Sequence, residues 1–231
     1  MMFSNSYKHS DLSKDKEALR ALLHLPVDSR VPNFLALRDV LVSRKTHGLP
    51  VSLELLDWLP KVEQWATRIM RSGIATEQRN EVLQLSSGPL LSLILQNMEE
   101  IVEGKRSHQL LLYSCHDTTL FPLLAVLGIS GSQEKEQGVP TREMKPSEET
   151  WPPFVACLCI DLFQEAESGK HFVQVSYLNQ SFPLPGCTSE PCPWSEFHAL
   201  LSPFALSAQE YTMKCQSSDS KSTSEPSPVT R

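Results

Sequence analysis

Apolar residues recur at the three- and four-residue spacing of amphipathic helices throughout the amino-terminal part of the chain. The first such segment stops at Pro26, and the second starts at Asn33, a residue type that suits a helix N-cap. Pro60 is well placed to start a later helix, and Gly88-Pro89 marks a break. The predicted helices span residues 16–25, 33–44, 53–58, 60–71, 80–85 and 90–102.

A different pattern follows in the second half of the chain. Apolar and polar residues alternate over 154–163 and 172–178, and a polar turn at 168–170 joins the two segments. This pattern predicts an antiparallel hairpin at the edge of a sheet. The apolar run 109–114 predicts a central strand, and 121–128 predicts a buried helix. The chain therefore reads as an α/β protein.

Other segments show neither the spacing of a helix nor the alternation of a strand. Residues 130–150 combine charges with Gly and Pro, and residues 216–231 are rich in Ser, Thr, Lys and Pro. We predict that both are disordered, as an insertion and a tail, together with the polar residues 1–14. Between them the patterns define a helical region over 15–104 and a region with strands over 105–215.

Composition narrows the class of protein. A chain of 231 residues with 40% hydrophobic content can bury a core, and a net charge of -6 without a basic stripe argues against nucleic-acid binding. The apolar run 120–129 is far shorter than the ~20 residues of a membrane span. Residues 1–16 show no targeting pattern. Nothing in the sequence indicates an oligomeric state.

The candidate chemistry follows the apolar run 109–114, which leads into Cys115, His116 and Asp117. A strand that ends on a titratable pair and turns into a helix places both side chains at the carboxyl edge of a sheet, where open α/β folds bind ligands. The amino end of the helix favours an anion such as phosphate, because its N–H groups are free and its dipole end is positive. An Asp before Thr118 also suits a simple helix N-cap.

Residues 114–119, Ser-Cys-His-Asp-Thr-Thr, resemble the second signature of the histidine acid phosphatases. The resemblance extends to the predicted hairpin, to the cysteine loop 185–193 and to the helices around His47, and it covers residues 14–216. It implies a partial doubly wound sheet of the phosphoglycerate-mutase type, with a helical cap and an antiparallel edge hairpin. Residues 105–215 would form the carboxyl part of this α/β domain.

The resemblance also implies roles for two residues. Asp117 matches the general acid that protonates the leaving alkoxide, and His116 matches a histidine that contacts the phosphoryl oxygens. No cofactor and no metal ion are implied. The implied substrate is a phosphomonoester, with lysophosphatidic acid as the candidate, because the helical region is most similar to members that act on it. Those members imply a mitochondrial compartment, and the wider family implies a secreted or lysosomal one.

One part of the family pattern has no counterpart in this sequence. The first signature, Arg-His-Gly-x-Arg, supplies the nucleophilic histidine and two phosphate-binding arginines, yet none of the seven histidines follows an arginine. His47-Gly48 ends a helical pattern, so we predict a helix-end role for it. The resemblance thus implies the carboxyl half only, a truncated chain that is inactive alone.

Two other functions stay open at this point. The chain could be a noncatalytic product that binds a phosphorylated ligand or a partner protein. It could also be a helical scaffold, unrelated to the family, in which His116-Asp117 is merely a capped turn.

The cysteines predict one local disulfide. Cys187 and Cys192 close a short loop bounded by prolines, a spacing that suits a disulfide. Cys157 and Cys159 alternate with an apolar residue, so we predict that they face the same side of a strand as small buried residues, and not as a metal pair. Arginines such as Arg38 are predicted on exposed helix faces.

Overall fold

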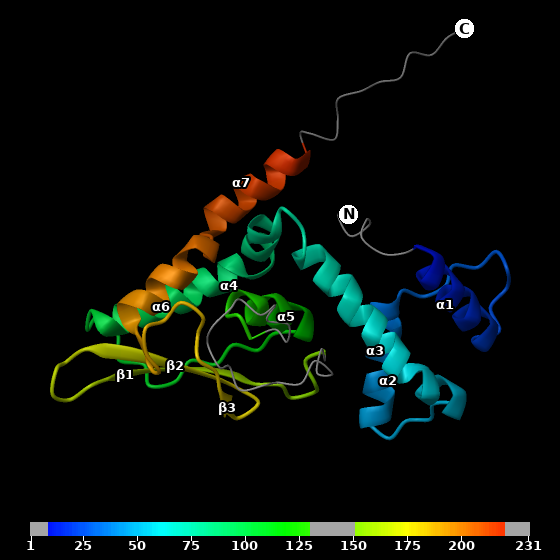
Figure 1. The fold of residues 1–231 in the computed structure, drawn as a ribbon, viewed down its shortest axis with the longest axis horizontal. Helices are drawn as coiled ribbons and strands as arrows, with labels where there is room; N and C mark the ends of the chain where they lie inside the picture. The colour runs from blue at the N-terminus through cyan, green and yellow to red at the C-terminus, as the bar shows by residue number, and fades with distance from the viewer. Residues whose placement is uncertain (1–8, 130–150, 220–231) are drawn as a thin grey trace, which may run out of the picture. The chain divides into compact units, whose positions relative to one another are not determined.

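The computed structural model describes residues 9–129 and 151–219, so the predicted insertion and most of the predicted tail lie outside the described residues. The chain divides into two compact units between Glu77 and Gln78, with Trp151 in the first unit. No described helix is long and apolar enough to cross a membrane. The helices are α1 (His9–Leu22), α2 (Phe34–Thr46), α3 (Leu53–Ile74), α4 (Arg79–Val102), α5 (Asp117–Val126), α6 (Trp194–Leu201) and α7 (Ala208–Asp219), with a 3-10 turn η1 (Ser202–Phe204) (Figure 1).

Side-chain caps start two helices of the first unit. The Asn33 side chain accepts a hydrogen bond at 2.6 Å from an N–H in the first turn of α2, which confirms the capping role predicted for it. Ser52 caps α3 in the same way, at 3.3 Å. α1 begins at His9, inside the segment 1–14 for which the sequence predicts disorder.

α3 runs without interruption through Pro60, so the prediction that a helix starts there is wrong. Proline removes one helical hydrogen bond, but the burial of α3 against α1 and α2 offsets that loss. Phe34 stacks on Trp65 in this core, with ring centroids 5.9 Å apart. The buried members of the core are Leu19, Phe34, Leu37, Leu41, Leu59, Val62 and Trp65.

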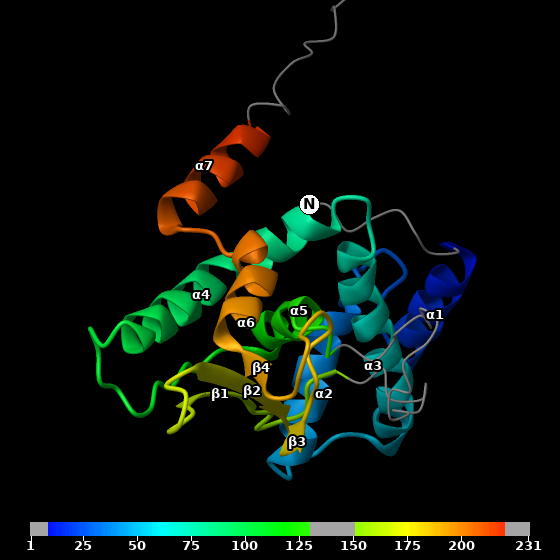
Figure 2. The same cartoon turned by 60° about the vertical axis from the view of Figure 1, so that its left-hand side comes forward.

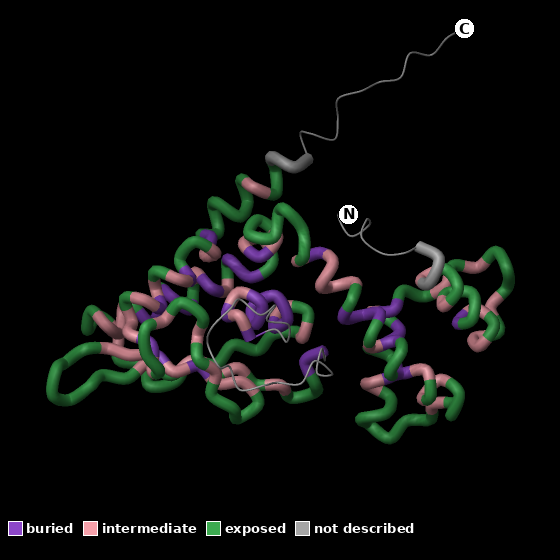
Figure 3. Tube along the Cα trace, viewed as in Figure 1, coloured by how far each residue is buried: buried purple, intermediate pink, exposed green. Residues whose placement is uncertain are grey.

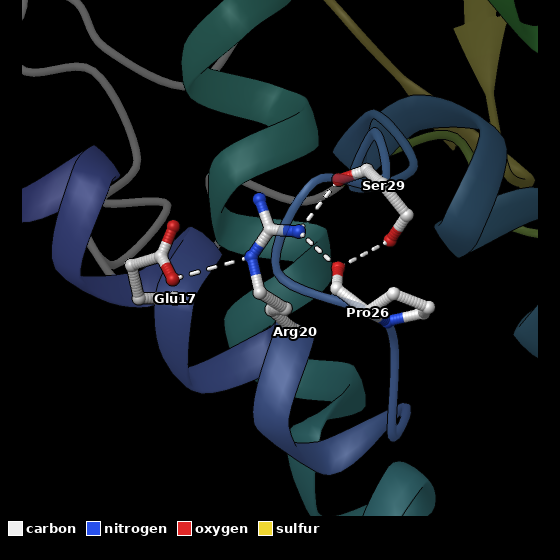
Figure 4. Close-up of polar contacts among 4 residues, drawn as sticks. All are labelled: Glu17, Arg20, Pro26 and Ser29. Atoms are coloured by element: carbon white, nitrogen blue, oxygen red, sulfur yellow. Dashed lines mark hydrogen bonds and ion pairs between the residues drawn. The ribbon is translucent and has the colours of Figure 1, made fainter.

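Arg20 fixes the loop that follows α1 (Figure 4). Its Nε lies 3.2 Å from a carboxylate oxygen of Glu17, and its Nη1 donates to the carbonyl oxygens of Pro26 at 2.9 Å and Ser29 at 2.6 Å. The Ser29 hydroxyl donates to the same Pro26 carbonyl at 2.7 Å. The guanidinium thus donates hydrogen bonds to carbonyl oxygens of the loop beyond the end of α1, which no helical N–H group reaches. The helix ends before Pro26, as predicted.

Asp15 connects α1 to α3 through two partners. Its carboxylate accepts the indole N–H of Trp65 at 2.7 Å and lies 2.6 Å from Nζ of Lys61. Burial alone would raise the pKa of this carboxyl group, but the hydrogen bonds from Lys61 and Trp65 and the nearby positive charges outweigh burial and hold its pKa below the usual value. The resulting stability is present above the unfolded-state pKa and is lost as the pH falls through the folded-state pKa.

We expect Asp15→Ala to lower the unfolding free energy of the first unit by about 1–3 kcal/mol at neutral pH, because the buried Trp65 N–H loses its acceptor. The difference from wild type should shrink on acidification through the lowered pKa, where the native carboxylate is itself protonated. Urea unfolding followed by far-ultraviolet circular dichroism at several pH values measures it. Asp57→Ala, at an exposed position of α3, is the control. An equal loss in the control would contradict this role for Asp15.

In the second unit, α4 also continues through a predicted break, at Gly88-Pro89. The carbonyl oxygen of Phe204 approaches so closely that a Cβ on Gly88 would lie 2.8 Å from it, and the Leu206 N–H donates to the Gly88 carbonyl at 3.1 Å. Packing against η1 therefore overrides the local helix-breaking signal. Because α4 packs on α5 and η1, the unit boundary precedes α4, whereas the sequence placed the end of its helical region at residue 104.

The second unit contains a four-stranded antiparallel sheet. β1 and β2 form the predicted hairpin, in register from Leu158↔Tyr177 to Gln164↔His171. Two short strands, β3 and β4, both pair with β2, and no two of the described strands pair in parallel. This mixture of helices and sheet is consistent with the α/β fold that the resemblance implies. The strands are β1 (Leu158–Gln164), β2 (His171–Tyr177), β3 (Gln180–Ser181) and β4 (Cys192–Pro193).

α4, α5 and α6 lie over the same face of the sheet in two views (Figures 1 and 2). In the second unit, the buried residues lie mainly on α4, α5 and α6, and β2 contributes Val173 and Val175 (Figure 3). Phe197 of α6 is fully buried in the resulting core and stacks on Trp194, with ring centroids 6.1 Å apart. Buried members of this core include Leu91, Leu95, Leu120, Leu124, Val173, Val175, Phe197 and Leu201.

Candidate functional site

His116 and Asp117 lie at the amino end of α5, where an extended segment turns into the helix. His116 is the N-cap residue, and its carbonyl oxygen accepts the N–H groups of Thr119 and Leu120 at 2.9 and 3.0 Å. Asp117 is the first helical residue, so the simpler expectation that Asp117 itself is the N-cap is wrong. The predicted turn from an extended segment into a helix is confirmed, but the helix begins at Asp117 itself, ahead of the predicted run 121–128.

The carboxylate of Asp117 has a defined backbone contact. Its Oδ1 accepts the Thr118 N–H at 2.8 Å. A protonated carboxyl group can keep one oxygen as an acceptor and carry its proton on the other, so this contact is compatible with proton donation. Asp117 is half-buried and the adjacent His116 is exposed, which leaves the imidazole accessible to a ligand.

The segment before the pair is not the predicted central strand. Residues 109–114 are not part of the described sheet, and Leu110 and Leu112 are 72% and 85% exposed. A strand requires a neighbour that completes its backbone hydrogen bonds. The described strands are all arranged around β2 instead. The strand prediction is therefore wrong for this structure, because an apolar run alone provides no pairing partner.

A polar network holds this segment against α4. The amide of Asn97, a buried residue, donates to the Tyr113 hydroxyl at 2.7 Å, and Arg106 donates to the side-chain oxygen of Asn97. Nε of Arg106 also lies 2.7 Å from a carboxylate oxygen of Glu100. Because Tyr113 shortly precedes His116, these contacts set the path by which the chain reaches the site. Sequence reasoning missed Asn97, since a single polar residue in a helical pattern does not reveal its partner.

A pocket of about 270 Å³ lies at the opposite end of α5. Arg79, one of its lining residues, donates to the Ala125 carbonyl oxygen at 3.1 Å. Neither His116 nor Asp117 lines this pocket, and a ten-residue helix such as α5 is about 15 Å long. The walls of the pocket also include Leu127, Gly128, Leu184, Pro185, Leu200 and Phe204. The structure thus places the two predicted residues next to each other, but outside this pocket.

Two expectations in the first unit have different outcomes. His47 is the C-cap residue of α2, which confirms its predicted helix-end role.

Arg38 is only 3% exposed, so its predicted exposure is wrong. Its guanidinium carbon lies 4.9 Å from the centre of the Trp151 ring, and Arg38 also pairs with Asp39 and Glu63. Stacking on an aromatic face allows this charge to be buried.

The cysteines also have two outcomes. A disulfide joins Cys187 and Cys192, with Cα atoms 5.5 Å apart, as the short loop predicts. Cys157 and Cys159 face the same side, but both are exposed, so their predicted burial is wrong. The alternate residues of β1 pack against the core, and the cysteines therefore face outward. The hydrogen bond with Cys157, followed by desolvation, raises the pKa of the Cys159 thiol.

Comparisons with known proteins give a consistent result. A family model described as the histidine phosphatase superfamily, branch 2, matches residues 3–178. The chain is 31% identical to lysophosphatidic acid phosphatase type 6 of Bos taurus over 209 residues, 89% of this chain and 43% of that protein. Identity to the Homo sapiens protein of the same name is 28% over 208 residues, 88% of this chain and 44% of the relative. Identity to prostatic acid phosphatase of Rattus norvegicus is 27% over 165 residues, 69% and 38% of the two chains. The chain thus spans less than half the length of these relatives.

Proposed function

Because the chain belongs to branch 2 of the histidine phosphatase superfamily, we propose that it is part of a histidine acid phosphatase that hydrolyses phosphomonoesters. The observation that carries the proposal is the His116-Asp117 pair at the amino end of α5, within the matched region. The positive end of the helix dipole favours a phosphate group there, whereas the N–H groups of Thr118, Thr119 and Leu120 are already bonded to Asp117 and His116. The phosphatase names of the relatives support the same substrate class.

The reaction that the resemblance implies has two steps. A histidine nitrogen attacks phosphorus, the ester P–O bond breaks, and the alkoxide leaves with a proton from an acid. Water then cleaves the phosphohistidine and releases inorganic phosphate. In this scheme Asp117 supplies the proton, and the His116 imidazole donates a hydrogen bond to a phosphoryl oxygen on which negative charge accumulates.

We propose lysophosphatidic acid as the substrate, on the basis of the type 6 relatives. Its phosphate is esterified to an alkyl alcohol, whose alkoxide is a poor leaving group. A positioned acid such as Asp117 is most valuable for a substrate of this kind.

We also propose that these 231 residues alone hydrolyse no phosphomonoester, because the sequence contains no Arg-His-Gly triplet to supply the nucleophile. Phosphate release from lysophosphatidic acid and from p-nitrophenyl phosphate, measured between acidic and neutral pH, should equal that of the His116→Ala, Asp117→Ala double variant. Circular dichroism establishes that both proteins are folded. A rate well above the double variant would overturn the proposal, since some histidine of this chain would then have to attack phosphorus.

A noncatalytic phosphate-binding role is the second candidate, favoured by the exposed His116 at a helix amino end in a sequence without the nucleophile motif. Isothermal titration with inorganic phosphate and with vanadate tests it. Binding by wild type that is lost in the double variant would support this role. If neither phosphate nor vanadate binds to the wild-type chain, this role is excluded. His116 and Asp117 would then only cap a helix and form no ligand site.

A further inference from the structure

Two exposed thiols lie side by side on the outer face of the sheet. Cys157 directly precedes β1 and Cys159 belongs to it, so the two residues are separated by the two-residue period that places side chains on one face of a strand. Their Sγ atoms are 3.7 Å apart, and both residues are exposed. Both thiols can therefore reach the same ligand from solvent.

The backbone around this pair is held by hydrogen bonds on both residues. Cys159 pairs with Ser176 in the β1–β2 ladder, which continues to the end of the hairpin. The carbonyl oxygen of Cys157 accepts the Leu178 N–H at 3.1 Å, so this residue is anchored although it precedes the strand. Leu158 lies between the two cysteines, and its side chain packs against the core. This contact keeps the cysteine side of the strand facing solvent.

The sulfur separation matches the requirement of one kind of ligand. Two thiolates bound to a tetrahedral Zn²⁺ at about 2.3 Å each lie about 3.8 Å from one another. The observed 3.7 Å agrees with that distance. A disulfide would instead require the sulfurs to approach to about 2.05 Å. In the structure the two thiols share a hydrogen bond at this distance, so a metal ion would replace that contact without moving the sulfurs further apart.

Although the sequence pattern alone predicts no metal pair here, the two thiols are exposed, and we propose that Cys157 and Cys159 form a bidentate thiolate site for a soft divalent cation of the Zn²⁺ type, with water in the remaining coordination positions. Two S–metal bonds form, both thiol protons go to solvent, and no group is oxidised or reduced. Thiolates select thiophilic cations over Mg²⁺ and Ca²⁺, which prefer oxygen ligands. This site is distinct from His116 and Asp117, and the proposal does not depend on the phosphatase function.

Zinc binding to the full chain, with its free thiols reduced and the Cys187–Cys192 disulfide intact, tests the proposal when measured by competition with a chromophoric chelator. One Zn²⁺ should bind per chain, and Cys157→Ser or Cys159→Ser should each weaken binding at least about 10-fold, because one of two ligands is lost. Cys115→Ser and Cys215→Ser are the matched controls and should retain the wild-type affinity within about twofold. Cys187→Ser is a further control, because reduction of the disulfide would free two thiols near Glu196.

A second measurement requires no variant. Stoichiometric Zn²⁺ should protect Cys157 and Cys159 of the wild-type chain from alkylation by iodoacetamide, as mapped by mass spectrometry, while the exposed Cys115 continues to react. Equal alkylation of the pair with and without Zn²⁺ would overturn the proposal. Unchanged affinity in both serine variants, or loss of binding in Cys187→Ser, would also overturn it.

Discussion

Asp117→Asn is expected to lower kcat for lysophosphatidic acid about 10²–10⁴-fold, the usual contribution of a positioned general acid. The measurement uses a chimera that joins this chain to the part of the Bos taurus type 6 relative outside the matched region. Asparagine preserves the size of the side chain and can still accept the Thr118 N–H through Oδ1. It has no acidic proton, so the alkoxide would have to leave unprotonated.

The choice of substrate separates this role from a structural one. p-Nitrophenolate leaves readily without a proton, so Asp117→Asn should slow hydrolysis of p-nitrophenyl phosphate far less than hydrolysis of lysophosphatidic acid. Asp161→Asn, at an exposed position of β1, is the matched carboxylate control and should change neither rate more than about twofold. Equal losses on the two substrates would show that Asp117 supports the structure of the site and does not supply the proton.

Phe197→Ala is expected to lower the unfolding free energy of the second unit by about 3–5 kcal/mol. The ring is fully buried among residues of α4, α5 and β2, and alanine would leave a cavity lined by their side chains. Domains are usually stable by only about 5–15 kcal/mol, so this loss would be a large fraction of the total. Urea unfolding, together with hydrogen exchange of peptides from α4 and β2, assigns the loss to this unit.

A second phenylalanine provides the control. Phe163 of β1 also stacks on an aromatic ring, that of Phe172, with centroids 6.1 Å apart, but it is 40% exposed. We expect Phe163→Ala to cost no more than about 1.5 kcal/mol, since most of what is lost is the stacking contact. If the two variants were equally destabilised, the core would not be organised around Phe197.

Local signals in the sequence predicted the parts of the fold that depend on neighbouring residues. The Asn33 cap, the hairpin turn at 168–170 and the Cys187–Cys192 loop each involve chemistry within a few positions, and each is present in the structure. The start of a helix directly after His116 belongs to the same class.

The failures arise where distant residues decide the structure. Pro60 and Gly88 break helices by local propensity, yet packing from other elements keeps α3 and α4 continuous. The outward orientation of Cys159 depends on which face of β1 meets the core, and residues 109–114 depend on a pairing partner. The roles of His116 and Asp117 stay predictions, because family resemblance suggests them and only the experiments above test them.

The exposed leucines that precede α5 affect how this polypeptide interacts with other proteins. Extended apolar backbone with unpaired edges invites association with other chains and is the kind of surface that molecular chaperones capture. Leu110 and Leu112 present such a surface in the folded state, not only during synthesis. We therefore expect these 231 residues, when expressed alone, to be bound by chaperones and degraded by proteases.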